Sequence, residues 1–507
     1  MKIGVLKEIK DNEKRVAVTP GVISKIKKLG YEIFVEHDSG IQASFYNEQY
    51  VESGAEISSK EEIYKCDLLL KINKPTHDEI NKLSNNQTLI SFFTPALNPE
   101  LLNLCKKDNI NIMSMDSVPR ISRAQKMDAL SSMANVAGSR AVIEAAHCFG
   151  RFFGGQITAA GKINPAKILI IGAGVAGLSA IGTASSLGAV VRAFDTRPEV
   201  KEQVESLGAQ FLTVNIDEDG SSKDGYAKVM SKEFIDAEMK LFREQAEDVD
   251  VIITTALIPG KEAPKLITRD MVELMKPGSV IVDLASQQGG NCELCQQDQI
   301  VDHGGVKIIG FTDLPSRLPS QSSELYANNL FHILDELTPD KNGEIMINMD
   351  DDVIRGMTVV KDGEITYPPP KVEVSAASTP QVETKAIHSS KPSIEKKSSI
   401  IPGLIALSLL FLVGAFAPAS FMNHFTVFVL SCFIGYMVIW NVTASLHTPL
   451  MSVTNAVSSI IIIGAITQIS TTDALSLILS GLAIFIASIN IFGGFAVTKR
   501  MLGMFKK

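Results

Sequence analysis

The stretch KILIIGAGVAGLSAIGTASSLGAVVRAFDTR, residues 167–197, decides the fold of the central part of this 507-residue chain. It begins with an isoleucine-rich apolar run that is typical of a buried parallel strand. Gly172, Gly174 and Gly177 follow with G-x-G-x-x-G spacing, and an alanine-rich segment then suits a helix. A second apolar run ends at Asp195. This order of strand, glycine turn, helix and strand predicts a doubly wound α/β domain.

Each residue of this motif has a physical role. Gly172 permits the tight turn, Gly174 lets a pyrophosphate approach the backbone, and Gly177 lets the helix lie against the sheet. The helix N-terminus offers unpaired N–H groups to phosphates. Asp195 lies where a carboxylate accepts a hydrogen bond from a ribose 2′-hydroxyl, which favours NAD over NADP, although Arg197 leaves NADP open. We predict a dinucleotide site; the alternative is a domain whose glycines only make a turn.

Short apolar runs alternate with helical patterns on both sides of this stretch. Strands are expected at residues 2–5, 31–35, 68–71, 88–93, 110–113, 211–214, 251–254, 280–283 and 306–309. Such alternation is typical of parallel α/β sheets. We therefore predict two Rossmann-like doubly wound domains with a cleft. The first is discontinuous, with residues 1–134 and 311–365, and the second, residues 135–310, binds the dinucleotide. A polar insertion at residues 217–248, loop-like and then helical, is expected to form a lid.

The C-terminal part has a different composition. Residues 366–399 are rich in Pro, Ser and Lys and are expected to form a flexible linker. Residues 400–498 contain four apolar segments with Asp473 as the only acidic residue, which predicts four transmembrane helices. Lysines precede the first segment and a basic tail, residues 499–507, follows the last. The positive-inside rule therefore places both ends, and the large N-terminal part, on the cytoplasmic side of a multi-pass membrane protein.

The totals exclude several classes of protein. A net charge of −8 argues against nucleic acid as a partner. The first residues, MKIGVLKEIKDNEKR, lack the apolar core of a signal peptide. Six cysteines in a chain of this length do not suggest a disulfide framework. Cys292 and Cys295 form an isolated C-x-x-C for which we expect a structural role, and we predict no metal site.

A second polar block, RISRAQKMDALS at residues 120–131, leads into a helical pattern at residues 127–149 that we expect to be the hinge. Gln125 and Asp128 are three positions apart and Ser131 is three further on, so one helical face would carry all three side chains. Uncharged hydrogen-bonding groups suit a nicotinamide carboxamide. The two arginines of the block have the charge to hold a pyrophosphate. The alternative is a capped amphipathic helix that faces solvent.

Taken together, the motifs resemble the alpha subunits of bacterial proton-translocating NAD(P) transhydrogenases, in the alanine dehydrogenase/transhydrogenase family. The resemblance covers essentially the whole chain. It rests on KEIKDNEKRVAVTP near the N-terminus, RISRAQKMDALSSMANVAG, the GAGVAG turn with Asp195-Thr196-Arg197, DGYAKVMS, TTALIPGKEAPKLIT, and NVTASLHTPLMSVTNAVSS among the apolar segments.

This resemblance implies hydride exchange between NAD(H) on this chain and NADP(H) on a beta subunit, coupled to proton movement, in a dimer of alpha–beta units. Gln125 would bridge toward the partner's nicotinamide, and Asp128 and Ser131 would hold the nicotinamide end. The implied NAD contacts are Arg120, Ile121, Ser122, Arg123, Gly172, Gly174, Val175, Gly177, Asp195, Thr196, Arg197, Gly225 and Tyr226. The single dinucleotide fingerprint agrees with a second nucleotide site on another chain.

Two other functions fit parts of the sequence. The N-terminal half also resembles alanine dehydrogenases, in which a Lys and a His handle the amino acid. Lys71 falls at the place of that Lys, but the His expected after TLISFF is missing, so a membrane-tethered amino-acid dehydrogenase is disfavoured. An NAD-sensing channel subunit would need a filter of the TVGYG kind, which does not occur. His447 is a candidate for proton relay or for an interfacial position, and Asp473 for a helix N-cap.

Overall fold

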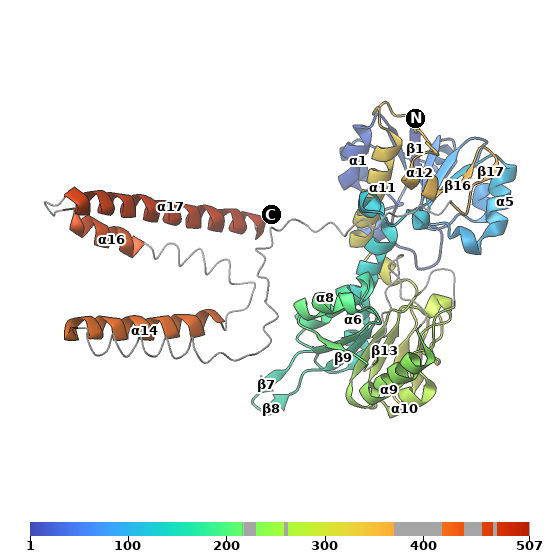
Figure 1. The fold of residues 1–507 in the computed structure, drawn as a ribbon. Helices are drawn as coiled ribbons and strands as arrows, with labels where there is room; N and C mark the ends of the chain where they lie inside the picture. The colour runs from blue at the N-terminus through green and yellow to red at the C-terminus, as the bar shows by residue number, and fades with distance from the viewer. Residues whose placement is uncertain are drawn as a thin grey trace. The chain divides into compact units, whose positions relative to one another are not determined.

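The computed structural model describes residues 1–214, 216, 230–257, 262–369, 418–440, 459–469 and 474–505. The chain forms two compact units, Met1–Glu383 and Thr384–Lys507 (Figure 1). Unit 1 contains two large sheets with helices on their faces and one two-stranded sheet, and the described part of unit 2 is helical. Two Rossmann-like α/β domains followed by apolar helices confirm the predicted fold class.

An eight-stranded sheet, in the order β17-β16-β6-β5-β4-β1-β2-β3, forms the first domain. Six strands run parallel to one another, and β16 and β17 add an antiparallel edge. The strands are β1 (Lys2–Val5), β2 (Glu32–Glu36), β3 (Glu56–Ser58), β4 (Leu68–Leu70), β5 (Thr88–Ser91), β6 (Asn111–Ser114), β16 (Thr358–Lys361) and β17 (Glu364–Ile365). Two apolar clusters, one containing Ile3 and Val35 and the other Leu69 and Ile112, form its core.

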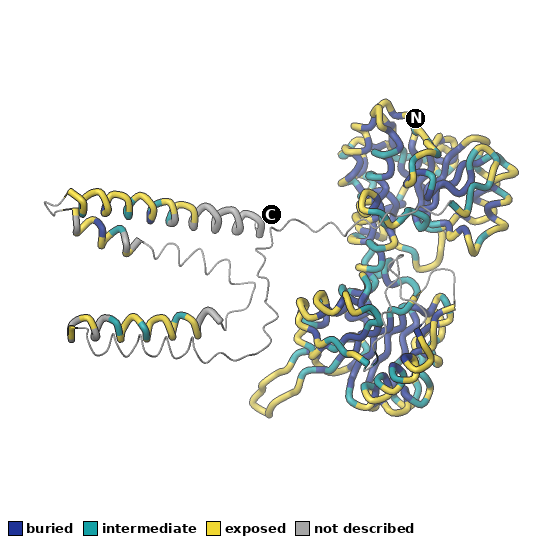
Figure 2. The backbone as a smooth tube through the Cα atoms, in the orientation of Figure 1, coloured by how far each residue is buried: buried dark blue, intermediate teal, exposed yellow. Residues whose placement is uncertain are grey.

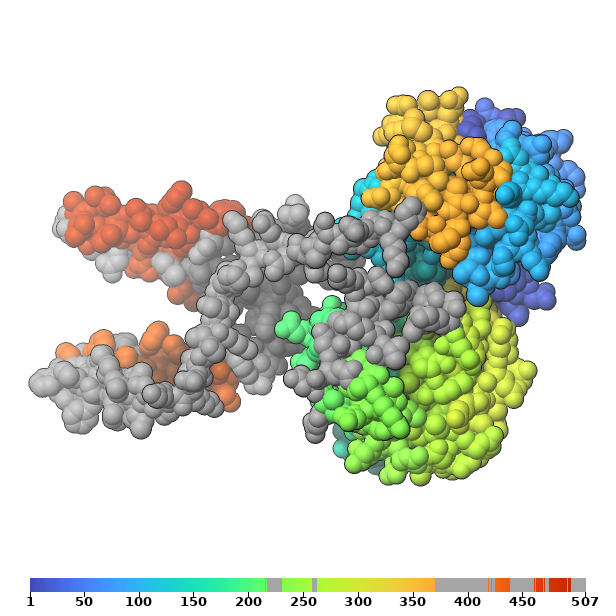
Figure 3. All heavy atoms as spheres, turned by 45° about the vertical axis from the view of Figure 1, so that its right-hand side comes forward, coloured from blue at the N-terminus to red at the C-terminus, as the bar shows by residue number. Residues whose placement is uncertain are grey.

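The helices of the first domain come from both ends of unit 1. They are α1 (Pro20–Lys27), α2 (Asn47–Glu52), α3 (Lys60–Ile63), α4 (His77–Ile80), α5 (Pro99–Lys107), α11 (Pro319–Leu337) and α12 (Asp352–Met357). Short 3₁₀ turns η1 (Ile41–Ala43), η2 (Pro95–Leu97), η3 (Met115–Ser117) and η7 (Leu314–Arg317) lie between them. The N-terminal ammonium of Met1 donates to the carbonyl oxygen of Gly343 at 2.7 Å. Figure 3 shows the two ends of unit 1, blue and orange, in one body.

A seven-stranded sheet, in the order β11-β10-β9-β12-β13-β15-β14, forms the second domain. Its strands are β9 (Lys167–Ile171), β10 (Val190–Phe194), β11 (Gln210–Leu212), β12 (Val251–Thr254), β13 (Val280–Asp283), β14 (Ile300–His303) and β15 (Val306–Ile309). Its helices are α7 (Val175–Ser186), α8 (Lys201–Ser206), α9 (Lys232–Asp248) and α10 (Arg269–Leu274), with 3₁₀ turns η5 (Pro198–Val200) and η6 (Ser286–Gln288). The strand order reverses direction at β9, and ligands bind beyond the carboxyl ends of strands at such a point.

Helix α6 (Ala129–Phe149) connects the two domains and packs along α7. Thr183 Oγ1 lies 3.0 Å from Ser139 Oγ, and Ser179 Oγ donates to the carbonyl oxygen of Asn135 at 2.7 Å. Both pairs are separated by 44 positions in sequence, so the two helices run in the same direction. The N-termini of α6 and α7 therefore lie on the same side of the second domain.

A two-stranded hairpin, β7 (Gln156–Thr158) and β8 (Gly161–Ile163), extends from the end of α6 before β9 begins. All six of its strand residues are exposed, and Figure 2 shows the hairpin as an exposed arm of the second domain. The sequence patterns did not predict this hairpin, because two three-residue strands leave no measurable periodicity.

The described part of unit 2 consists of α14 (Ala419–Trp440), α16 (Ser459–Gln468) and α17 (Ala474–Phe505). Among the described residues, Ala474–Gly493 is the one stretch long and apolar enough to cross a membrane, and Phe425–Met437 is a shorter apolar helix. Helix α17 continues beyond the predicted end of the last span through Lys499 and Arg500. The first predicted segment, residues 400–417, lies outside the described residues, as do His447 and Asp473.

Candidate nucleotide site

The glycine turn after β9 is built as its spacing predicts. Gly172 has a φ of +95°, which favours glycine, and a Cβ on Gly177 would overlap the carbonyl oxygen of Gly172. Thr255 Oγ1 donates to the carbonyl oxygens of Ile171 and Gly172, both at 3.1 Å, and fixes the turn against β12. These contacts bring the first turn of α7 directly over the end of β9.

The N-terminus of α7 faces open space suited to an anion. Gly174 is the N-cap of α7, and a Cβ there would have Arg197 Nη2 as its nearest neighbour at 4.0 Å. Val175, the first residue of the helix, is exposed, and the first turn carries no acidic side chain. Free N–H groups, the positive end of a 12-residue helix and a guanidinium therefore converge on one place. This combination fits a pyrophosphate.

Asp195, immediately after β10, is held rigidly beside this turn. Its Oδ2 accepts from the N–H of Ala173 at 2.7 Å, and its Oδ1 accepts from the N–H of Arg197 at 2.9 Å. The Arg197 guanidinium also donates to both carboxylate oxygens at 2.9 Å. The hydrogen bond to Asp195 raises the pKa of Arg197. The predicted ribose acid is therefore in place but already forms an ion pair.

Thr196, between these two charged residues, has a buried hydroxyl that makes no hydrogen bond to any described residue. An unsatisfied buried hydroxyl costs about 1–3 kcal/mol, so its presence beside a fixed carboxylate and an open helix N-terminus favours a polar ligand here. The residues of this site thus fit the adenosine ribose and pyrophosphate of a dinucleotide.

The second predicted block differs from our expectation. Residues Ser122–Met127 form a 3₁₀ helix, η4, and Asp128 is non-helical, with φ −72° and ψ 87°. The expectation that one helical face carries Gln125, Asp128 and Ser131 is therefore wrong. Asp128 instead caps α6: its Oδ1 accepts from the Ser131 N–H at 2.9 Å, and Ser131 Oγ donates to its Oδ2 at 2.6 Å. The spacing of apolar residues that is typical of a helix continues through Asp128, so the sequence pattern did not show the break between η4 and α6.

The cap of α6 nevertheless lies next to the glycine turn. Asn135 and Ser139 of α6 contact Ser179 and Thr183 of α7, with a constant offset in sequence. Extending this register back by one turn brings Ser131 to the level of Val175. Two helix N-termini, one capped by a carboxylate and one open, are thus neighbours at the carboxyl edge of the second sheet.

The remaining predicted residues occupy varied environments. Gln125, Arg120 and Ser122 are exposed, and Ile121 is half-buried. Arg123 donates to Glu336 Oε2 at 3.3 Å and to Asp351 Oδ2 at 2.7 Å, so it is paired with carboxylates of the first domain. Ion pairs of such exposure contribute little free energy and can be exchanged for a phosphate. Gly225 and Tyr226 lie outside the described residues.

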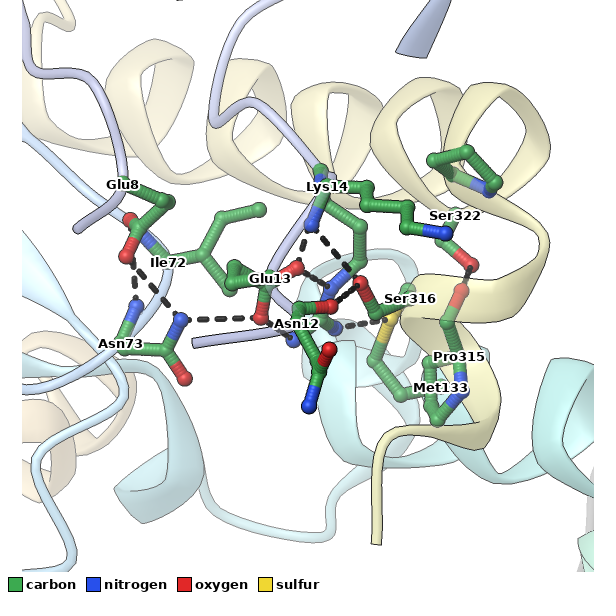
Figure 4. A network of polar contacts seen from close by, with 12 residues as sticks. Glu8, Asn12, Glu13, Lys14, Ile72, Asn73, Met133, Pro315, Ser316 and Ser322 are labelled. Atoms are coloured by element: carbon green, nitrogen blue, oxygen red, sulfur yellow. Dashed lines mark hydrogen bonds and ion pairs between the residues drawn. The ribbon is translucent and has the colours of Figure 1, made fainter. Parts of the chain in front are cut away.

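Lys71 does not face the nucleotide turn but belongs to a buried network of charges. It is 1% exposed, and its Nζ lies 2.6 Å from Glu79 Oε1 and 3.8 Å from Glu8 Oε2. Asn73 Nδ2 joins the carboxylates of Glu8 and Glu13, at 3.0 and 2.9 Å (Figure 4). Lys71 is therefore neutralised internally, as expected for a structural cation.

The same network continues through Glu13 to Arg15, which is 9% exposed. Burial opposes the ionisation of Glu13, but hydrogen bonds from Arg15 at 2.6 and 2.7 Å lower the pKa of Glu13 to about 2. Burial raises the pKa of Glu8. The N-terminal segment KEIKDNEKR thus supplies buried ion pairs.

Cys292 and Cys295 do not form a reactive or metal-binding pair. Burial raises the pKa of Cys292 to about 11 and also raises the pKa of Cys295. The Cys292 N–H donates to Asp283 Oδ2 at 2.8 Å. Among the residues that the structure describes, no group of three His, Cys, Asp or Glu side chains suits a metal.

The two doubly wound domains and the glycine turn followed by Asp195 are typical of nicotinamide-dinucleotide-binding proteins of the dehydrogenase class. Comparison with known families is more specific. Residues 4–137 and 141–368 match the N- and C-terminal domains of "Alanine dehydrogenase/PNT". Residues 424–507 match the "4TM region of pyridine nucleotide transhydrogenase".

Individual relatives agree with these matches. The chain is 56% identical to the NAD(P) transhydrogenase subunit alpha of Haemophilus influenzae over the full length of both chains. A crystal structure of transhydrogenase from Sinorhizobium meliloti matches 73% of this chain and 99% of that chain, with a TM-score of 0.64 and 36% identity. The chain therefore belongs to the family of NAD(P) transhydrogenase alpha subunits.

Alanine dehydrogenase is a more distant relative. The Bacillus subtilis enzyme is 29% identical, over 72% of this chain and 93% of its own length. The His that alanine dehydrogenases have after the TLISFF segment is absent from this sequence, and Lys71 is paired with carboxylates of its own domain. Both observations agree with a distant relationship to alanine dehydrogenase. The full-length match to a transhydrogenase subunit also leaves the channel alternative without support.

Proposed function

We propose that this chain binds NAD(H) in its second domain and exchanges hydride directly with NADP(H) on a beta subunit, coupled to proton translocation. The observation that carries the proposal is the glycine turn with Asp195 in a chain that matches a transhydrogenase alpha subunit from end to end. The sequence of 507 residues contains one dinucleotide-binding G-x-G-x-x-G motif with its strand, helix and acidic residue, which supports a binding site for the second nucleotide on the partner subunit.

The residues around the turn hold and orient the nucleotide, and none of them is proposed as a nucleophile. The N-terminus of α7 with Arg120 and Arg123 neutralises the pyrophosphate, and Asp195, Thr196 and Arg197 contact the ribose end of NAD(H). Asp128 and Ser131 hold the nicotinamide end, and Gln125, which is exposed, reaches toward the partner. The bound coenzyme supplies the hydride chemistry. The protein contributes the relative orientation of two rings and the exclusion of water.

The assembly and its place in the cell are part of this proposal. We infer a dimer of alpha–beta units in the bacterial inner membrane, with four spans in this chain that complete a bundle with helices of the partner. Both soluble domains, the linker and the basic C-terminus face the cytoplasm. Gly225 and Tyr226 belong to the loop that closes over the nucleotide.

The test is reconstitution of this chain with a beta subunit in lipid vesicles. NADH and an NADP⁺ analogue with a distinct absorbance are supplied, and hydride transfer and internal pH are followed together. We expect transfer and proton movement with both subunits and neither with one alone. Transfer by this chain alone, or none with two folded and assembled subunits, contradicts the proposal.

Replacement of Gln125 by Asn shortens an exposed side chain by one methylene and retains its amide. We expect hydride transfer to slow by about tenfold, because orientation of the rings is sensitive to small displacements. NADH affinity should change by less than about twofold, since the ribose and pyrophosphate contacts lie elsewhere. Single-turnover transfer and NADH titration measure the two quantities. Equal losses in both would remove the special role of Gln125.

A further inference from the structure

One core position of α9 carries a carboxylic acid. Phe234, Glu238, Phe242 and Ala246 recur every four residues and form the buried face of this helix. Glu238 is 8% exposed and makes no hydrogen bond or ion pair to the described residues. Burial of an unpaired carboxyl group is costly, and the apolar stripe around it would accept a Leu or Met. A functional reason for the acid is therefore needed.

The position of Glu238 points to the ribose end of the nucleotide site. The ring of Phe242 packs edge-on against Phe194, the last residue of β10, with ring centroids 5.2 Å apart. As the crossover helix between β11 and β12, α9 runs back along the sheet, so Glu238, one turn before Phe242, lies nearer the carboxyl ends of the strands. Asp195 directly follows Phe194. Burial and then the charge of Asp195 raise the pKa of Glu238 to about 7.

Asp195 alone gives weak selection against a 2′-phosphate. Arg197 donates to both of its oxygens, so the guanidinium offsets the repulsion between Asp195 and a 2′-phosphate. An arginine beside the ribose is also the group that accommodates the extra phosphate of NADP(H). Glu238 provides a second carboxyl group at the ribose end of the site, and this group has no cationic partner among the described residues.

We propose that Glu238 determines the coenzyme preference of this site, because its carboxyl group on the helix that packs against Phe194 disfavours a phosphate at the ribose 2′ position. The proposal rests on NAD(H) binding as the function of the second domain. A ribose with free hydroxyls places no charge near Glu238. A 2′-phosphate requires Glu238 to be protonated, so binding of NADPH takes up a proton whereas binding of NADH does not.

Two other charged residues of α9 form ion pairs away from Glu238, and the remaining ones, Lys232, Glu233, Asp236, Lys240, Glu244 and Glu247, are exposed. Asp248, at the C-terminal end of the helix, pairs with Lys167 and Arg192. Arg243 pairs with Asp270 of α10. Asp195 is thus the charged group that acts on Glu238 among the described residues of the packed elements.

The experiment measures the affinities of the purified full-length chain for NADH and NADPH, in detergent, at pH 6.0, 7.0 and 8.5. In the wild-type chain the preference for NADH should rise by about tenfold over this range. Glu238→Gln should bind NADPH about tenfold more tightly at pH 8.5, with NADH affinity within about twofold, and should lose the rise in preference. Glu233→Gln, an exposed acid on the same helix, should behave like wild type, as should Glu238→Asp.

Thermal unfolding gives a second readout. The folded-state pKa of Glu238 is raised, so its contribution to stability is present below pH 4.5 and is lost as pH rises to about 7. Glu238→Gln should therefore raise the melting temperature at pH 8.5 relative to wild type and not at pH 5. Should Glu238→Gln fail to fold, Glu238→Met tests the same loss of charge in an apolar stripe.

An unchanged preference in a folded Glu238→Gln or Glu238→Met chain overturns this inference and leaves the proposed function intact. Absence of NADH binding by the wild-type chain at every pH overturns the proposed function itself.

Discussion

Replacement of Lys71 by Met is expected to lower the free energy of unfolding of the first domain by about 3–5 kcal/mol. The ammonium group is 1% exposed and lies 2.6 Å from Glu79 and 3.8 Å from Glu8. Without it, the buried carboxylates of Glu8 and Glu79 repel each other with no cation between them. Either the carboxylates take up protons or the domain unfolds. Urea denaturation of the full-length chain in detergent, followed by circular dichroism, measures the change.

Lys65→Met is the matched control. Lys65 Nζ also lies 2.6 Å from a carboxylate, that of Glu62, but the two side chains are 69% and 59% exposed. An ion pair in water contributes at most about 1 kcal/mol, so the control should unfold almost as wild type does. If both variants lost the same free energy of unfolding, the burial of Lys71 would not determine how much its ion pairs stabilise the domain.

Replacement of Gly138 by Ala is expected to cost about 2–3 kcal/mol of stability and to weaken NADH binding. A Cβ at Gly138 would overlap the carbonyl oxygen of Ala176, which is backbone and cannot turn away. Ala176 belongs to the first turn of α7, next to Val175. Any shift that relieves the overlap therefore moves the phosphate-binding end of α7 relative to the cap of α6. NADH titration and thermal unfolding measure the two effects.

Gly182→Ala on α7 provides the contrast. No atom lies within 4 Å of a Cβ at Gly182, and Ala is a better helix former than Gly by about 1 kcal/mol. This variant should be slightly more stable and should bind NADH normally. If Gly138→Ala binds NADH as tightly as Gly182→Ala, the contact between α6 and α7 does not position the site.

Local signals allowed much of the second domain to be predicted. The strand expected from residue 167 to 171 is β9, and the run ending at Phe194 is β10. The residues that determine these elements are close together in the sequence: an isoleucine-rich run, Gly172 with its positive φ, and Gly177, at which an added Cβ would overlap the backbone. The second half of the polar insertion is helical as predicted, as α9.

Features that depend on distant partners could not be predicted. Asn73 and Glu13 are 60 positions apart, and no periodicity in KEIKDNEKR shows that its charges are buried. Asp128 was wrongly placed inside a helix because the apolar spacing continues through it; only the backbone shows that it is a cap. The one sign of Glu238 in the sequence is an acidic residue within an apolar stripe. Spacing alone does not show what such a residue does. The roles of the predicted site residues stay predictions until nucleotide binding is measured.

The order of segments in the first domain has a consequence for biosynthesis. Strand β16 pairs with β6, yet about 240 residues separate them, including the whole second domain. The ribosome therefore releases a complete second domain while the first sheet still lacks β16, β17 and the covering helix α11. Chains that end at residue 318 and have been released from the ribosome should resist protease in the second domain and remain cleavable in the first.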